Sequence, residues 1–167
     1  MIAMGGNSIS PKNGTGKIEE QFGRTRQALD GIAHFIDRGY NLCINHGNGP
    51  QVGNEIMRME LTQNTIPPLP LGVCVASTQG SIGYMIQQCL QNKLRDMDVD
   101  REVVTLVSQV IVDKNDDSFK DPTKYIGNRY TRKEADEMTS RYGWYFKEQE
   151  KDRFRRVVPS PMPEYIM

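Results

Sequence analysis

The residues best suited to chemistry lie in a glycine-rich stretch, 45–53, which reads Asn-His-Gly-Asn-Gly-Pro-Gln-Val-Gly. Gly47 and Gly49 flank Asn48, and without a Cβ they can take positive φ and let another molecule approach the backbone. Pro50 falls where a first helical turn tolerates proline, because its missing N–H would be unpaired there. The free N–H groups of such a turn and the positive end of the helix dipole favour an anion. The stretch therefore predicts strand, anion-binding turn and helix, whereas a lone Gly-x-Gly would indicate only an ordinary tight turn.

A second turn of the same kind lies near the N-terminus. Gly5, Gly6 and Asn7 follow a short apolar start, and they again offer bare backbone and one amide side chain. Alone, this tripeptide is weak evidence. If both turns end neighbouring parallel strands, however, they face one crevice, which is where open α/β sheets usually hold their ligands.

The periodicity of the chain predicts the elements that would position the two turns. Apolar residues recur every three or four positions across 18–36, which indicates an amphipathic helix. Gly39 is well placed to end that helix. The apolar run 40–44 then predicts a strand. A strand–helix–strand unit implies parallel pairing and a right-handed connection.

Three further elements follow. A helix is expected from Gln51, until the proline-rich segment 66–70 breaks it. A long helical pattern then covers about 71–97. The β-branched run 103–112 predicts a strand buried on both faces. The whole pattern favours an α/β fold, a three-layer α/β/α lobe with a mainly parallel sheet.

Composition sets wide bounds on function. The chain has 167 residues, which is enough for one domain with a sizeable core. With 21 basic and 21 acidic side chains, it gives no electrostatic argument for a nucleic acid or an anionic membrane as partner. No apolar run is long enough to span a bilayer. Two histidines and no C-x-x-C pair give no zinc pattern. The three cysteines, Cys43, Cys74 and Cys89, are expected to be buried reduced thiols of a cytosolic protein.

Five motifs, in this order along the chain, together resemble those of the carbamate kinases, a branch of the amino-acid kinase family. They are Gly5-Gly6-Asn7, the segment His-Gly-Asn-Gly-Pro-Gln-Val-Gly at 46–53, Thr-Gln-Gly-Ser-Ile-Gly-Tyr at 78–84, Asp-Pro-Thr-Lys at 121–124, and Arg-Val-Val-Pro-Ser-Pro at 156–161. The resemblance covers essentially the whole chain but only about the N-terminal half of the family's enzyme. The apolar start before Gly5 is shorter than in the family, which indicates a late start or a few missing residues.

The resemblance implies a reversible reaction, ATP plus carbamate to ADP plus carbamoyl phosphate, within arginine metabolism. It implies that Lys124 is catalytic and that carbamate or carbamoyl phosphate is held by Gly5, Gly6, Asn7, Gly47, Asn48 and Gly49. ATP or ADP and Mg²⁺ would bind mainly to a C-terminal nucleotide lobe that this sequence does not contain. The complete enzyme is expected to be a cytoplasmic homodimer, and this chain is expected to be inactive alone. The alternative is a catalytically inactive remnant that binds anions or another subunit.

The same resemblance implies a protruding subdomain at about 113–158 that carries Lys124 over the carbamate site. A third hypothesis, an amino-acid kinase with a different acyl acceptor, is disfavoured by the motifs of this subdomain. Several positions depart from the family: Tyr125 and Asn128 replace prolines, and Lys151, Arg153 and Phe154 stand where the family has a glycine-containing turn. These changes leave open the conformation of the loop and of the hairpin.

Local signals inside the subdomain are clear. The Asp-rich segment 113–122 lacks the spacing of an EF-hand and indicates a solvated turn. Thr131 and Glu134 form a capping box that opens a short helix, which Gly143 is expected to close. Segments 144–146 and 154–158 are then expected to pair as strands.

Gly80 and Gly83 lie three residues apart in the predicted long helix. Each costs about 1 kcal/mol of helix stability relative to alanine. Close approach by another segment is the simplest compensation. That segment is either part of this chain or, as the resemblance suggests, part of another subunit.

Overall fold

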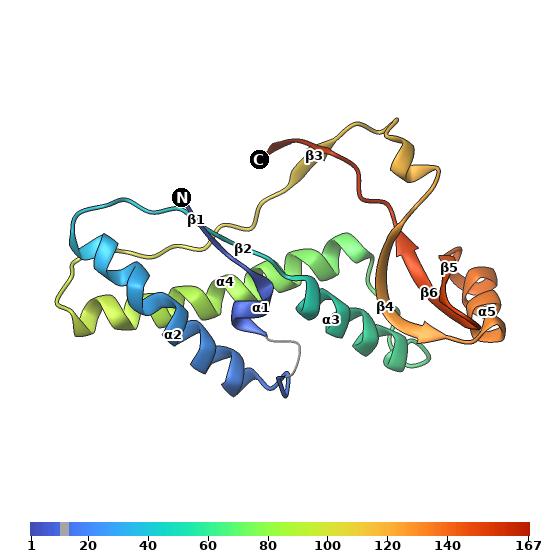
Figure 1. Ribbon diagram of the computed structural model, residues 1–167, viewed down its shortest axis with the longest axis horizontal. Helices are drawn as coiled ribbons and strands as arrows, with labels where there is room; N and C mark the ends of the chain where they lie inside the picture. Colours follow the sequence, from blue (N-terminus) through green and yellow to red (C-terminus); the bar gives the residue numbers. More distant parts are fainter. Residues whose placement is uncertain (11–13) are drawn as a thin grey trace. The chain divides into compact units, whose positions relative to one another are not determined.

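The computed structural model describes residues 1–10 and 14–167, with the backbone alone for Asn7 and Ser8. It divides into two compact units, Met1–Val52 with Pro70–Val107 and Gly53–Leu69 with Ser108–Met167. Figure 1 labels the elements in chain order: β1 (Ile2–Met4), α1 (Gly6–Ile9), α2 (Ile18–Asp37), β2 (Ile44–His46), α3 (Gly49–Thr62), α4 (Leu71–Asp96), β3 (Val110–Val112), the 3₁₀ turn η1 (Asp117–Phe119), β4 (Lys124–Tyr130), α5 (Arg132–Tyr142), β5 (Tyr145–Glu150), β6 (Arg153–Val158) and β7 (Pro163–Ile166).

The first unit contains the predicted strand–helix–strand arrangement. β1 and β2 pair in parallel, with Met4 opposite His46, and α2 connects them (Figure 1). The helix α2 packs along α4, and buried apolar side chains from both helices join the strands in one core. The fully buried members of that core include Ile9, Leu29, Ala33 and Leu94. Burial of this stripe, rather than helix propensity alone, accounts for most of the stability of such helices.

The long helices begin and end close to their predicted positions. Gly39 follows α2 with φ 86°, a left-handed value that favours glycine. The strand expected at 40–44 was misplaced, because β2 begins only at Ile44 and Tyr40 is 58% exposed. The aromatic ring of Tyr40 instead contacts Phe35 edge to face, with ring centroids 6.0 Å apart.

The strand expected at 103–112 is wrong for most of its length. Only Val110–Val112 pairs, as β3, while Val104 and Leu106 are 74% and 83% exposed. β-branched composition fits a pleated, half-buried surface, but it forms a strand only where another backbone supplies hydrogen bonds. Among the described residues, no strand pairs with 103–107.

The mainly parallel three-layer sheet is not confirmed. Within the described residues, the β1–β2 pair is the parallel one. β3 pairs with β7, and β6 lies between β4 and β5, all antiparallel. The structure is therefore a mixture of helices and mostly antiparallel strand pairs.

The second unit contains the short helix and hairpin expected near its end. The Thr131 hydroxyl accepts from the Glu134 N–H while the Glu134 carboxylate accepts from the Thr131 N–H, which confirms the capping box. Gly143 closes α5 with φ 67°. β5 and β6 pair as a hairpin in which Asp152 takes φ 58°. Aspartate is one of the residues that tolerate this region, so the turn forms without the family's glycine.

The cysteines are free, as expected, but one is not buried. Cys74 and Cys89 lie in the interior of α4, whereas Cys43 is exposed just before β2. Cys43 is exposed because β2 begins only at Ile44, which leaves Cys43 in the connecting segment. Across the described residues, no helix combines the length and apolar character that crossing a bilayer requires.

Candidate functional site

The two glycine turns meet in the first unit. The Gly47 N–H donates to the Met4 carbonyl at 3.1 Å, which continues the β1–β2 pairing into the second turn. A Cβ built on Gly47 would lie 3.3 Å from the backbone nitrogen of Gly6. A Cβ built on Gly6 would lie 3.4 Å from Cδ of Pro50. The prediction that both turns lie at neighbouring strand ends is therefore confirmed in geometry.

Of the two expected properties, positive φ and open backbone, the first is not found in these turns. None of Gly5, Gly6, Gly47 and Gly49 has positive φ; among the described residues, the glycines that do are Gly16, Gly39, Gly127 and Gly143. Gly6 and Gly47 instead allow two backbones to come within contact distance. Gly5 and Gly49 have open space where a Cβ would stand, so their backbones are accessible from outside.

The helix that leaves the second turn begins at Gly49. Val52 N–H donates to the Asn48 carbonyl at 2.9 Å. Helix geometry leaves the N–H groups before Val52 without a partner inside the helix. Together with the positive end of the α3 dipole, they suit a bound anion. Pro50 lies in this first turn, where it removes a donor that the helix does not use.

Amide side chains attach the second turn to both neighbouring helices. Asn48 Nδ2 donates to Thr78 Oγ1 of α4 at 3.0 Å. Gln51 Nε2 donates to Gln21 Oε1 of α2 at 3.1 Å, and Gln21 Nε2 donates to the Gly16 carbonyl at 3.1 Å. Thr78 belongs to one of the five motifs, but no role of its own was predicted for it. The hydrogen bonds of Gln21 and Gln51 were not predicted. One available signal was a polar residue adjoining the apolar stripe of α2, because a buried amide needs a partner.

Two predicted site residues, Asn7 and Lys124, are not placed at the glycine turns by the contacts given above. The side chain of Asn7 lies outside the described residues. Lys124 begins β4 in the second unit, paired in register with Val158, and its side chain is exposed. Within residues 1–10 and 14–167, no carboxylate forms an ion pair with its ammonium group. That the Lys124 side chain approaches the glycine turns stays a prediction.

The second unit also buries a carboxylate that the sequence did not indicate. Glu60 of α3 is 8% exposed, and its Oε1 lies 3.4 Å from where a Cβ on Gly127 of β4 would stand. The Tyr130 hydroxyl faces it without good hydrogen-bond geometry. Burial raises the pKa of Glu60, although the Tyr130 hydroxyl and the Arg156 guanidinium oppose the shift. Burial and the adjacent carboxylate likewise raise the pKa of Tyr130 far above its ordinary value.

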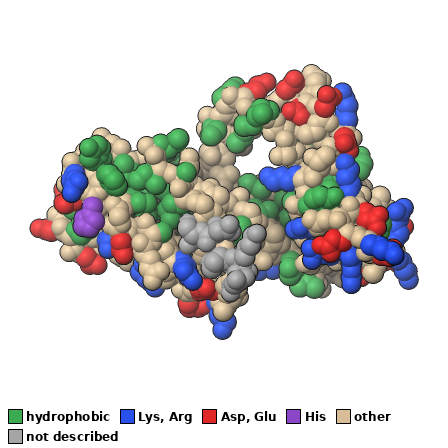
Figure 2. Space-filling model, in the orientation of Figure 1, with side chains coloured by type: hydrophobic (Ala, Val, Ile, Leu, Met, Phe, Trp, Pro, Cys, Tyr) green, Lys and Arg blue, Asp and Glu red, His purple; other side chains and the backbone are tan. Residues whose placement is uncertain are grey.

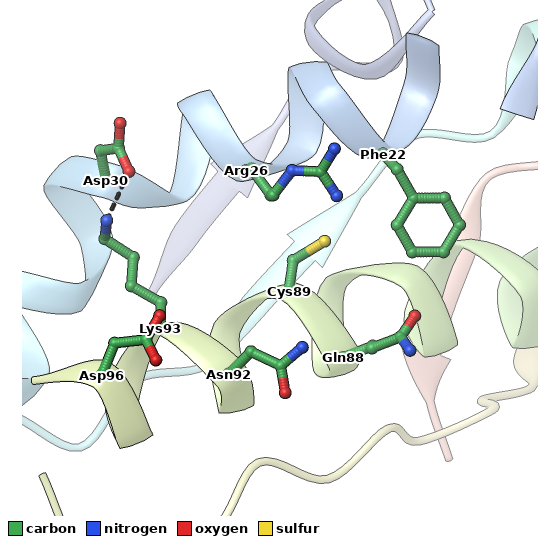
Figure 3. A pocket seen from close by; sticks show the side chains of 8 residues that line it. All are labelled: Phe22, Arg26, Asp30, Gln88, Cys89, Asn92, Lys93 and Asp96. Carbon is green, nitrogen blue, oxygen red and sulfur yellow. Dashed lines mark ion pairs between the residues drawn. The ribbon is translucent and has the colours of Figure 1, made fainter. Parts of the chain in front are cut away.

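A cavity of about 330 Å³ lies between α2 and α4. Figure 3 shows the Arg26 and Phe22 side chains from α2 facing Cys89 from α4, with the Asp30–Lys93 ion pair at one end. That ion pair has a separation of 2.6 Å. Burial raises the pKa of the Cys89 thiol, which disfavours the nucleophilic thiolate. The cavity shares no residue with the two glycine turns.

The charges and donor groups fit an anion better than a metal ion. No cluster of three or more His, Cys, Asp or Glu side chains that could hold a metal occurs within the described part of the chain. On the face of the molecule seen in Figure 2, basic and acidic side chains are interspersed over α5 and the β4–β6–β5 sheet.

Comparison with known proteins gives a consistent result, although no protein-family model matches the chain. The carbamate kinase of Pyrococcus furiosus is 45% identical over 166 residues, covering 98% of this chain and 53% of the relative. Carbamate kinase 2 of Staphylococcus epidermidis is 42% identical over 171 residues, covering 100% of this chain and 53% of the relative. Carbamate kinase from Giardia lamblia bound to AMP-PNP superimposes with a TM-score of 0.90 at 36% identity, covering 99% of this chain and 52% of that one. The chain thus spans about half the length of these relatives, and the resemblance inferred from the five motifs is confirmed.

Proposed function

This chain is homologous to the carbamate kinases over about half of their length, and on that premise we propose that it forms the carbamate side of a carbamate kinase site. The reaction is transfer of a phosphoryl group between ATP and carbamate, in either direction. The observation that carries the proposal is the meeting of two glycine turns at the ends of paired parallel strands. The first-turn N–H groups of α3 at that place are suited to carboxylate or phosphate oxygens.

The proposed substrate site is built mainly from backbone. Its members are Gly5, Gly6, Asn7, Gly47, Asn48 and Gly49. Accessible backbone at Gly5 and Gly49 supports direct contact with the ligand, and the dipole of α3 adds attraction for negative charge. Asn48 adds a side-chain amide whose position is fixed by its neighbour on α4.

Lys124 is the proposed catalytic cation. Phosphoryl transfer leaves little covalent work to the protein, so positioning and charge neutralisation account for most of the catalysis. An ammonium group near the transferring phosphoryl oxygens stabilises the charge that develops on them. The exposed side chain of Lys124, without a carboxylate partner among the described residues, is consistent with a group that meets its partner only in the assembled site.

The other half of the complete enzyme supplies the nucleotide and Mg²⁺ in this proposal. A relative bound to AMP-PNP supports a nucleotide as partner. Residues 103–107 would pair there with further strands to complete a mainly parallel three-layer sheet, with 113–158 as the protruding subdomain. A cytoplasmic homodimer in arginine metabolism completes the proposal.

A phosphate titration followed by amide NMR tests the site in this chain. Inorganic phosphate or carbamoyl phosphate at millimolar concentration should shift the amide signals of residues 5–7 and 47–49 together. Sulfate-free buffer and sodium chloride at equal ionic strength form the control, since screening alone acts on all exposed charges. Shifts confined to one turn, or absent from both, contradict a shared anion site. The inactive-remnant alternative predicts the same shifts but no phosphoryl transfer after the second half is supplied.

A further inference from the structure

The hydrogen bond between Asn48 and Thr78 is a built feature of the first unit. Thr78 lies in the interior of α4 with 1% of its surface exposed. Its hydroxyl donates to the Val75 carbonyl at 2.8 Å and accepts from Asn48 Nδ2 at 3.0 Å. Thr78 also belongs to one of the five motifs that resemble the carbamate kinases.

These two contacts fix the orientation of the Asn48 amide. A threonine hydroxyl has one proton, and here that proton lies toward Val75. Toward Asn48 the hydroxyl can therefore only accept, so the NH₂ end of the amide faces Thr78. The amide keeps its carbonyl oxygen and one further N–H for other partners.

Resting on the proposed function, we propose that Thr78 is a positioning residue that orients Asn48 to recognise the amino group of the substrate. The Asn48 carbonyl oxygen accepts a hydrogen bond from the NH₂ of carbamate or carbamoyl phosphate. A methyl group cannot donate such a bond. A site with a fixed acceptor therefore rejects the acetyl analogue, because the acceptor then loses water without gaining a partner.

The test compares two ligands of nearly equal shape on three proteins. Carbamoyl phosphate and acetyl phosphate differ in NH₂ against CH₃, and their dissociation constants are measured from the amide shifts of residues 47–49. The wild-type chain should bind carbamoyl phosphate about tenfold more tightly, the effect of one hydrogen bond to a part-buried acceptor. Thr78→Val keeps the shape of the side chain but loses the hydroxyl, and it should bring the ratio close to one. Thr78→Ser retains the hydroxyl and should keep the preference.

The ratio of the two dissociation constants distinguishes a positioning role of Thr78 from a role in general stability. A merely structural role for Thr78 predicts that Thr78→Val weakens both ligands equally, and an unchanged ratio overturns the proposal. Equal binding of both phosphates by the wild-type chain overturns it as well, while leaving the anion site intact. Absence of binding by either phosphate overturns the proposed site together with this inference.

Asn48→Ala provides a second route if Thr78→Val does not fold. It removes the proposed acceptor from the turn without changing the interior of α4. Retained preference for carbamoyl phosphate in this variant contradicts recognition by Asn48. Loss of the preference, with phosphate still shifting the amide signals of residues 5–7, supports it.

Discussion

At the scale of single residues, the glycine turns depend on the small size of glycine and not on its access to positive φ. The sequence suggested positive φ at Gly47, but the chain there has no left-handed residue and instead runs close to Gly6. A methyl group on Gly47 would meet a backbone nitrogen, which cannot rotate away as a flexible side chain can. Glycine at this position thus favours the close contact of the two turns, because a Cβ would require the Gly6 backbone to shift by a few tenths of an ångström.

We expect Gly47→Ala to push the turns apart and to weaken phosphate binding about tenfold or more, because the donors would no longer converge on one anion. The dissociation constant from the NMR titration measures this effect. Gly23→Ala is the matched control, since a Cβ there would have open space in the interior of α2. It should leave binding unchanged and stabilise the helix by about 0.5–1 kcal/mol. Equal binding by Gly47→Ala and the control would argue against the close approach.

Lys124 tests the catalytic side of the proposal in a complete enzyme assembled from this half and a matching nucleotide half. Lys124→Ala should lower kcat by about a hundredfold or more, the scale of a lost oxyanion donor. Tm should barely change, because exposed substitutions usually alter stability by less than about 0.5 kcal/mol. Lys124→Arg should rescue only partly, since a planar fork replaces a compact ammonium. Lys133→Ala, at an exposed position on α5, should be neutral, and a normal kcat in Lys124→Ala would refute the assignment.

At the scale of elements, α3 and β4 meet around the buried Glu60 carboxylate. Its pKa is raised in the folded chain, mainly by burial. The folded state therefore holds this proton more tightly than the unfolded state does. The stabilisation is complete below the ordinary pKa of about 4.5 and is lost as pH rises through the raised value.

Glu60→Gln should remove this pH dependence, because the amide stays neutral at every pH. Its Tm should exceed that of the wild type at pH 7, and the difference should shrink toward pH 4. Trp144, the single tryptophan of the chain, lies in the same unit and reports the transition by fluorescence. Glu137→Gln, an exposed change on α5, is the control. A Tm difference that is constant with pH would show that Glu60 is not the titrating group.

Helix ends are the elements that local sequence predicts best. The capping box at Thr131 and the left-handed Gly143 enclose α5 as expected. Each signal acts within four residues, so no distant partner is needed. The hairpin that follows shows the limit of this reasoning, because the sequence left its conformation open and Asp152 adopts the left-handed conformation there.

At the scale of the whole molecule, the segment 104–107 carries strongly exposed apolar side chains. Leu106 is 83% exposed, and Val107 is 58% exposed. Within the same segment, the Thr105 side chain fills the space beside Gly83, and its hydroxyl donates a hydrogen bond to Gln87 Oε1 at 2.9 Å. The close approach at Gly83 is thus explained within the chain, whereas Gly80 has open space.

We expect the purified 167-residue chain to form no ATP from ADP and carbamoyl phosphate at a rate comparable to a complete enzyme. Phosphoryl transfer needs groups on both sides of the transferring phosphoryl, and the proposal places only one side here. A coupled assay for ATP measures the rate, with a complete carbamate kinase as the positive control. Robust turnover by the chain alone would contradict the proposed division of the site.

Sequence alone was enough to predict the periodic helices, the cap of α5, the meeting of the two glycine turns and the resemblance to the carbamate kinases. Each of these depends on residues a few positions apart or on motifs in a fixed order. The three-dimensional arrangement was needed to show that residues 103–107 pair with no strand among the described residues, that Glu60 is buried, and that Asn48 is held by Thr78. The physical reason is that strand pairing, burial and side-chain hydrogen bonds need partners from distant segments, and local pattern does not specify which segment arrives.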